Sequence, residues 1–182
     1  MLTEFQNQKL THLFNVYDTD GNSTLTENDF VVIVDNIAEL YKLEANSPEA
    51  GQIRARYLGF WQGLQQFADA DQNMRVNLQE WFAFFDHMLN TEGVYQQMIG
   101  ALAKDVISVF DSDGNDKLGL DEYQNFFSAN SIDVSLAEGP FASMDSDGDG
   151  YLSEAEVLEA LHQFYHSEDV SAPGNSFFGP IG

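Results

Sequence analysis

The chain has 182 residues, no cysteine, and 30 acidic side chains against seven basic ones, so its formal net charge is −23 at pH 7. The absence of cysteine excludes disulfides, thiolate metal sites and cysteine nucleophiles. Seven positive charges cannot neutralise a nucleic-acid backbone, and an anionic membrane surface repels so acidic a chain, so neither is expected as a partner.

The first residues, Met1 to Phe5, lack the basic region and the apolar stretch of a secretory signal peptide. The longest apolar run, Phe30 to Val34, is too short to span a bilayer. Because 43% of the residues are hydrophobic, the chain can form a packed core. We therefore expect a soluble cytoplasmic protein, and its high net charge favours a monomer.

Apolar residues recur at helical spacing before and after each of four acidic segments, which predicts eight helices in four helix–loop–helix units. A capping box of Thr3 and Gln6 begins the first helix, and Ser47 with Pro48 begins the third. Gly139-Pro140 must shorten or kink the seventh helix. In chain order, the predicted core positions are Leu10, Leu13, Phe14 and Tyr17; Phe30, Ile33, Val34, Ile37 and Tyr41; Ile53, Tyr57, Phe60, Leu64 and Phe67; Trp81, Phe84, Phe85 and Met88; Tyr95, Met98, Leu102, Val106, Val109 and Phe110; Tyr123, Phe126 and Phe127; Phe141 and Met144; and Val157, Leu158, Leu161, Phe164 and Tyr165.

The four acidic segments, residues 18–29, 69–80, 111–122 and 145–156, share one pattern of twelve positions. An oxygen-bearing side chain stands at positions 1, 3, 5 and 12, and an aliphatic side chain stands at position 8. This is the pattern of the EF-hand calcium loop. It predicts an all-α fold of four helix–loop–helix units in two pairs, because position 8 of each loop makes a short antiparallel contact with a neighbouring loop. The position-8 residues are Leu25, Val76, Leu118 and Leu152.

Calcium chemistry explains this spacing. Ca²⁺ takes about six to eight oxygen ligands, and short side chains at positions 1, 3 and 5 point oxygens at one centre. Position 7 supplies a backbone carbonyl, and an acidic residue at position 12 reaches back from the following helix. If the four segments were only solvated acidic turns without a metal, they would not need to repeat the whole twelve-position pattern. The predicted ligands are Asp18, Asp20, Asn22, Thr24 and Asp29; Asp69, Asp71, Asn73, Arg75 and Glu80; Asp111, Asp113, Asn115, Lys117 and Glu122; and Asp145, Asp147, Asp149, Tyr151 and Glu156.

The four loops differ at two positions. Position 6 needs a positive φ angle, and only the fourth loop has glycine there, Gly150. The first loop ends in Asp29, which is one methylene shorter than glutamate and suits six-coordinate Mg²⁺. Met74 at position 6 disfavours the second loop, which alternatively serves as a structural partner of the first. We expect occupancy to fall in the order fourth, third, first and second loop, with up to four Ca²⁺ ions and with Mg²⁺ in competition.

Several segments resemble the invertebrate sarcoplasmic calcium-binding proteins and their relative calexcitin. They are the start Glu4-Phe5-Gln6-Asn7-Gln8-Lys9-Leu10, the helix segment Trp61-Gln62-Gly63-Leu64, the Glu80-Trp81 junction and the end Asn175-Ser176-Phe177-Phe178-Gly179-Pro180. The loop starts, separated by 51, 42 and 34 residues, match this group better than the shorter repeat of calmodulin-like sensors.

The resemblance implies one compact body in which two EF-hand pairs pack together and a role in buffering cytosolic Ca²⁺ without an obligatory protein partner. The expected divisions are residues 1–92 for the first pair, 93–166 for the second and 167–182 for a carboxy-terminal tail. Phe177, Phe178, Pro180 and Ile181 form an apolar tip on that tail. We expect the tip to dock on the core, since two adjacent phenylalanines are unfavourable in water.

Two other functions stay open from the sequence. A calcium sensor would open a hydrophobic groove for a protein target, although a chain with only five methionines lacks the methionine-rich character of such grooves. A photoprotein or luciferin-binding protein would need a cavity lined by histidine, tyrosine and tryptophan. Its candidate residues are Trp61, Trp81, Tyr57 and His87.

Enzyme activity is not expected, because the sequence contains no nucleophile motif, phosphate-binding loop or zinc-protease signature. His162 and His166 have the spacing of a transition-metal clamp on one helix, but no third ligand with matching geometry is evident. We interpret them as part of an ordinary helix surface. His12 and His87 are isolated histidines without a triad pattern.

Overall fold

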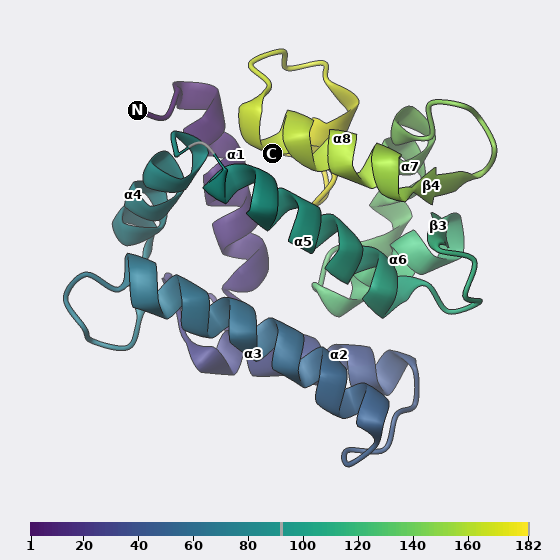
Figure 1. Cartoon of the computed structure of the whole chain (residues 1–182), viewed down its shortest axis with the longest axis horizontal. Coiled ribbons are helices and arrows are strands. Elements are labelled where there is room, and N and C mark those ends of the chain that lie inside the picture. The colour runs from purple at the N-terminus through teal and green to yellow at the C-terminus, as the bar shows by residue number, and fades with distance from the viewer. Residues whose placement is uncertain (92, 182) are drawn as a thin grey trace.

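The computed structural model describes residues 1–91 and 93–181, which form eight α-helices, two short antiparallel sheets and two 3-10 helices (Figure 1). The predicted all-α fold with four helix–loop–helix units in two pairs is confirmed. The elements are α1 (Glu4–Tyr17), β1 (Thr24–Leu25), α2 (Glu27–Leu40), α3 (Pro48–Ala68), β2 (Val76–Asn77), α4 (Leu78–Leu89), α5 (Val94–Phe110), β3 (Lys117–Gly119), α6 (Leu120–Ala129), η1 (Val134–Leu136), α7 (Glu138–Met144), β4 (Tyr151–Ser153), α8 (Glu154–His166) and η2 (Pro173–Ser176).

Helix boundaries follow the local signals. The Thr3 hydroxyl accepts a bond from the Gln6 amide at 3.2 Å, and the Gln6 side chain accepts one from the Thr3 amide at 2.9 Å, so the predicted capping box is confirmed. Ser47 caps α3 in front of Pro48. Helix α7 has only seven residues. Pro140 is its third residue, within the first turn, where a backbone amide has no intrahelical partner to lose.

Two short sheets pair the loops as predicted. Leu25 of β1 lies opposite Val76 of β2, and Leu118 of β3 lies opposite Leu152 of β4. All four side chains have no exposed surface. The first two loops therefore form one pair and the last two loops form the other, with the aliphatic residue at position 8 fixing the register of each.

The two pairs share one hydrophobic core. Helix α1 packs against α4 of its own pair and α8 of the other. The indole nitrogen of Trp81 donates to the Leu10 carbonyl at 2.9 Å, and the rings of Phe85 and Tyr165 stack with centroids 5.5 Å apart. Figure 1 shows α5 between the α2–α3 pair and α8. These contacts make the chain one compact body.

The carboxy-terminal tail packs on α1, α6 and α8. Phe177 and Phe178 are at most 1% exposed. The Tyr123 hydroxyl donates to the Phe177 carbonyl at 2.8 Å, and His12 Nε2 lies 2.8 Å from the Phe178 carbonyl oxygen. Gly174 is required for this approach, because a Cβ atom there would lie 2.2 Å from the Ala160 carbonyl oxygen. The predicted apolar tip extends less far than expected, since Pro180 is exposed.

A buried lysine joins the tail to the first helix. Lys9 is 1% exposed, and its ammonium group donates to the carbonyls of Gln163 and Ser167 and to the Asn175 side-chain oxygen at 2.7–3.2 Å. Burial lowers the pKa of Lys9 to about 8, although the carboxylate of Glu168 opposes the shift. The side chain is therefore still charged at pH 7, and three oxygens satisfy it.

Two predicted core positions are wrong. Phe67 is 73% exposed and Leu158 is 37% exposed. Phe67 lies in the last turn of α3, seven residues after Phe60, and continues the same apolar row. The buried side of this end of the helix is formed instead by Trp61, Leu64 and Ala68. Among the described residues, no element covers the Phe67 side chain.

The predicted division at residue 92 and the end of the tail at residue 182 fall on the two residues outside the described part of the chain. Within the described residues, no helix combines the length and the apolar character needed to cross a membrane.

Candidate metal centres

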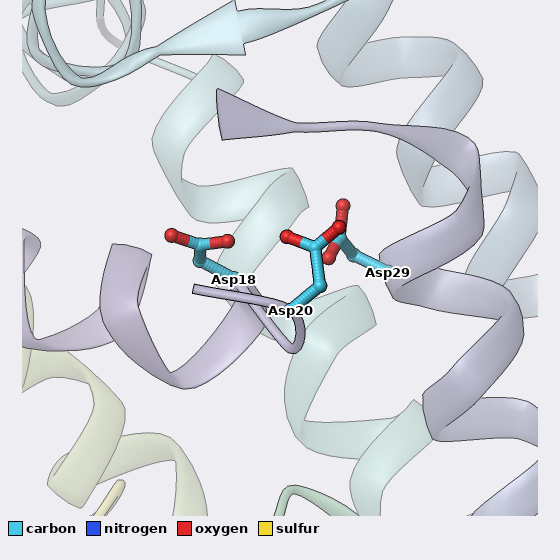
Figure 2. Close-up of side chains that lie close together, drawn as sticks. All are labelled: Asp18, Asp20 and Asp29. Atoms are coloured by element: carbon cyan, nitrogen blue, oxygen red, sulfur yellow. The ribbon is translucent and has the colours of Figure 1, made fainter. Parts of the chain in front are cut away.

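Each of the four loops brings three carboxylates together. Within a group, one oxygen of each side chain lies within 4.8 Å of an oxygen of the others. Figure 2 shows the first group, in which Asp18 and Asp20 come from the loop and Asp29 from the first turn of α2. The groups are Asp18, Asp20 and Asp29; Asp69, Asp71 and Glu80; Asp111, Asp113 and Glu122; and Asp145, Asp147 and Glu156.

Backbone amides hold these oxygens in place, as the fourth loop illustrates. Asp145 at position 1 accepts from the amides of Asp149 at 3.2 Å and Gly150 at 2.9 Å. Asp147 at position 3 also accepts from the Asp149 amide, and Asp149 itself accepts from the Tyr151 amide at 2.9 Å. The corresponding bonds recur in the other three loops, made by Asp18, Asp20 and Asn22; Asp69, Asp71 and Asn73; and Asp111, Asp113 and Asn115.

The acidic residue at position 12 joins the two ends of its loop. In the fourth loop, one oxygen of Glu156 accepts from Ser146 and the other accepts from Ser153. Burial alone would raise the pKa of Glu156, but these hydrogen bonds outweigh it and lower the pKa to about 2. Asp29, Glu80 and Glu122 receive bonds from the same two loop positions. A carboxylate held ionised at this point fits a hard divalent cation.

Position 7 carries four different side chains, as expected if only its backbone carbonyl coordinates a metal. The ammonium group of Lys117 in the third loop pairs with the carboxylate of Asp149 in the fourth. It also lies 5.6 Å from the ring centroid of Tyr151, the position-7 residue of the fourth loop. Lys117 thus places a positive charge on a predicted metal ligand of the neighbouring loop. The sequence pattern of a single loop carried no sign of this contact.

Backbone conformation distinguishes the second loop from the others. Position 6 has a positive φ in every loop, and the value at Met74 is 61°. Position 4 also has a positive φ. Glycine occupies it in the other three loops, but Gln72 stands there in the second with a φ of 58°. The second loop therefore holds two non-glycine residues in the left-handed region, each at a cost of about 1–2 kcal/mol. Met74 is the position predicted to disfavour this loop, whereas Gln72 was not predicted, although the glycines at position 4 of the other loops indicate the same requirement.

Met74→Gly is expected to raise the free energy of unfolding by about 1 kcal/mol, because glycine adopts a positive φ without the steric cost. Met74 is 70% exposed, so little packing is lost. Urea denaturation in the presence of a chelator measures the effect without a metal contribution. Arg75→Gly is the matched control, since Arg75 has no positive φ, and it should not stabilise the chain. Equal effects of Met74→Gly and Arg75→Gly on the free energy of unfolding would contradict the backbone strain at Met74.

His162 and His166 belong to none of the four carboxylate groups. The Tyr95 hydroxyl lies 2.9 Å from His162 Nδ1, and the rings of His162 and His166 are 5.2 Å apart. Among the described residues, the groups able to hold a metal consist of carboxylates alone. Four acidic loops of this geometry, each between two helices and paired by short strands, define an EF-hand protein.

The comparisons agree with this class. The family model described as "EF-hand domain pair" matches residues 1–36. Calerythrin from Saccharopolyspora erythraea is 22% identical over 167 residues, which are 91% of this chain and 94% of calerythrin. Calexcitin-1 from Caenorhabditis elegans is 24% identical over 184 residues, with 96% of this chain and 86% of calexcitin-1 covered.

Two solved structures share the fold. A sarcoplasmic calcium-binding protein from amphioxus has a TM-score of 0.73 at 19% identity, with 100% of both chains covered. Coelenterazine-binding protein from Renilla muelleri has a TM-score of 0.76 at 21% identity, covering 99% of this chain and 100% of that one. Together, the matches support membership of the sarcoplasmic calcium-binding protein and calexcitin group. The chain is an EF-hand calcium-binding protein.

Proposed function

We propose that the chain is a cytoplasmic Ca²⁺ buffer in which Mg²⁺ competes for the same sites. The observation that carries this proposal is the burial of the apolar helix faces within the chain itself. Phe178 packs on Phe164 and Phe177 on Phe126, with ring centroids 4.9 Å and 5.4 Å apart. A sensor needs such a face for its target, whereas a buffer barely opens. Metal binding without catalysis, by a monomer, is the whole of the proposed activity.

The proposed ligands are the oxygens at positions 1, 3, 5, 7 and 12 of each loop, with position 7 acting through its backbone carbonyl. Hard oxygen donors at this spacing fit Ca²⁺. We propose that residues 1–92 and 93–166 work as two pairs and that residues 167–182 serve as an internal cover. The fourth and third loops bind most tightly. The second loop binds least tightly because Gln72 and Met74 strain it.

Asp29→Glu is expected to raise the Ca²⁺ affinity of the first loop and to lower its preference for Mg²⁺. The longer side chain reaches the ion with both oxygens, and the higher coordination number suits Ca²⁺. Competition of Mg²⁺ against Ca²⁺, followed by calorimetry, measures the change. Asp35→Glu on the exposed side of α2 is the matched control. If Asp29→Glu keeps the original preference for Mg²⁺, as Asp35→Glu should, then the length of the residue at position 12 does not set that preference.

Calorimetric titration with Ca²⁺, in the absence and presence of millimolar Mg²⁺, tests the buffer. The proposal predicts several tight sites in the absence of Mg²⁺ and weaker apparent Ca²⁺ binding in its presence, because Mg²⁺ must first leave. A chain with no site tighter than millimolar would not buffer cytosolic Ca²⁺, and that result would overturn the proposal.

The luciferin alternative has weaker support. A cavity of about 400 Å³ is present, and Tyr57 lines it. The other three candidates, Trp61, Trp81 and His87, are not among the described residues that line this cavity. The predicted combination of histidine, tyrosine and tryptophan is therefore not assembled there, and buffering is the function that the geometry supports better.

A further inference from the structure

The fourth loop has an acidic residue at a position where the other loops have a neutral one. Its position 5 is Asp149, whereas the other loops have Asn22, Asn73 and Asn115 there. In each of those three loops, the asparagine amide donates to the carboxylate at position 3 at 2.8–3.0 Å. Asp149 cannot donate to Asp147 in this way, because both side chains are carboxylates. Position 5 therefore adds repulsion to the fourth loop instead of a hydrogen bond.

Lys117 of the third loop supplies a positive charge at this point. Its ammonium group donates to Oδ2 of Asp149, while Oδ1 of Asp149 accepts from the Tyr151 amide at 2.9 Å. The pairing of β3 with β4 determines the contact, since Lys117 lies opposite Ser153 in this sheet (Figure 1). The Tyr151 ring borders the ammonium group, with its centroid 5.6 Å away. Both oxygens of Asp149 thus have protein partners, and a metal that takes Asp149 as a ligand must compete with them.

The ion pair separates Asp149 from the other acidic ligands of its loop. The carboxylates that meet in the fourth loop are those of Asp145, Asp147 and Glu156. Asp149, the fourth acidic ligand, lies outside this group and is bonded to Lys117 instead. The number of charged ligands is one of the properties that tune the affinity of an EF-hand loop for Ca²⁺. A lysine bonded to one of these ligands therefore acts on the affinity directly.

The first pair of loops provides a comparison. Arg75 stands at position 7 of the second loop, as Lys117 does in the third, but position 5 of the neighbouring first loop is the neutral Asn22. Arg75 forms no ion pair with the described residues. A basic position 7 is therefore not sufficient for the contact, which also needs an acidic position 5 in the neighbouring loop.

We propose that Lys117 determines the affinity of the fourth loop, because its ammonium group competes with the metal for Asp149. While this ion pair is intact, the fourth loop has three free acidic ligands, the same number as each of the other loops. Ca²⁺ gains the fourth carboxylate only when the pair breaks, so the affinity falls by the strength of the pair. For an exposed ion pair this corresponds to about two- to fivefold. Lys117 has this effect only if the loops bind Ca²⁺, so the proposal rests on the proposed buffering role.

The Gly150 amide donates to Asp145 at 2.9 Å, so its NMR signal reports on the fourth loop within the whole chain. A titration with chelator-buffered Ca²⁺, followed at this signal, measures the affinity of that loop. Lys117→Met should raise the affinity about threefold, and sodium chloride should reduce the gain because salt screens the pair. Lys104→Met is the matched control. Lys104 is exposed on α5 and forms no ion pair with the described residues, so its substitution removes the same charge without releasing Asp149.

Asp149→Asn tests whether Lys117 acts through this carboxylate. In the Asp149→Asn chain, addition of Lys117→Met should change the affinity no more than Lys104→Met does. The melting temperature gives a second readout. Lys117→Met should lower it in excess chelator, where the pair offsets repulsion within the loop, and should leave it nearly unchanged in saturating Ca²⁺. A purely structural role of Lys117 would lower the melting temperature equally in both conditions.

Three results would overturn the role of Lys117 while leaving the buffer intact. They are equal effects of Lys117→Met and Lys104→Met on the affinity, a gain from Lys117→Met that persists in the Asp149→Asn chain, and equal losses of melting temperature in chelator and in Ca²⁺. If the unmodified chain has no site tighter than millimolar, the buffer itself fails, and the proposal for Lys117 fails with it.

Discussion

Removal of bound divalent cations is expected to lower the free energy of unfolding by several kcal/mol, the largest effect we predict for this chain. A site held at one hundred times its dissociation constant contributes about 2.7 kcal/mol, and sites that bind only the folded chain add. In the absence of metal, each loop confines three carboxylates whose oxygens lie within 4.8 Å of one another, in a chain of net charge −23. Their repulsion destabilises the compact state.

Thermal denaturation followed by circular dichroism measures this effect in Ca²⁺, in Mg²⁺ and in excess chelator. The melting temperature should be highest in Ca²⁺ and lowest in chelator. A chelator sample with added sodium chloride is the control, since general screening of charge would then restore part of the stability without site binding. Identical melting temperatures in Ca²⁺ and in chelator would show that the four acidic groups hold no stabilising metal.

Glu156→Gln is expected to weaken Ca²⁺ binding at the fourth loop roughly 100-fold. Loss of an outer-shell partner alone costs roughly 10–100-fold in metal affinity, and Glu156 is proposed as a direct ligand. The amide keeps the size of the side chain, but it removes a negative charge and one of two metal-facing oxygens. Hydrogen bonds from Ser146 and Ser153 show that the carboxylate is already oriented at the loop ends.

Calorimetry should count one tight site fewer in this variant. Glu159→Gln on the same helix is the matched control, because Glu159 is exposed and lies outside the loop. It should leave the number of sites and their affinities unchanged. Unaltered Ca²⁺ binding by Glu156→Gln would contradict the assignment of position 12 as a ligand in this loop.

The local architecture could be predicted from the sequence because short-range rules determine it. The alternation of acidic residues fixes each loop turn, and the aliphatic residue at position 8 fixes which residues face each other, as Leu25 and Val76 do. The capping box at Thr3 and the shortened helix at Pro140 depend on neighbours within one turn. Three carboxylates per loop accordingly meet in space.

Long-range packing could not be predicted in the same way. Lys9 has the appearance of a surface residue, yet it is buried because α8 and the tail, more than 150 residues later in the chain, supply its acceptors. Phe67 continues an apolar row, yet it is exposed because the elements that pack on this end of α3 cover its other side, at Trp61, Leu64 and Ala68. The cavity depends on the distance at which the two helix pairs pack, and helical periodicity contains no information about that distance.

The protection of the tail against amide hydrogen exchange is the measurement that most directly tests whether the chain binds Ca²⁺ without opening. Residues 173–178 should be followed in millimolar Mg²⁺, before and after saturation with Ca²⁺. A buffer predicts that the amide of Phe177, bonded to the Gly174 carbonyl, stays protected in both states. Loss of protection on adding Ca²⁺ would mean that the tail leaves α6 and α8, and the chain would then act as a sensor that exposes an apolar groove.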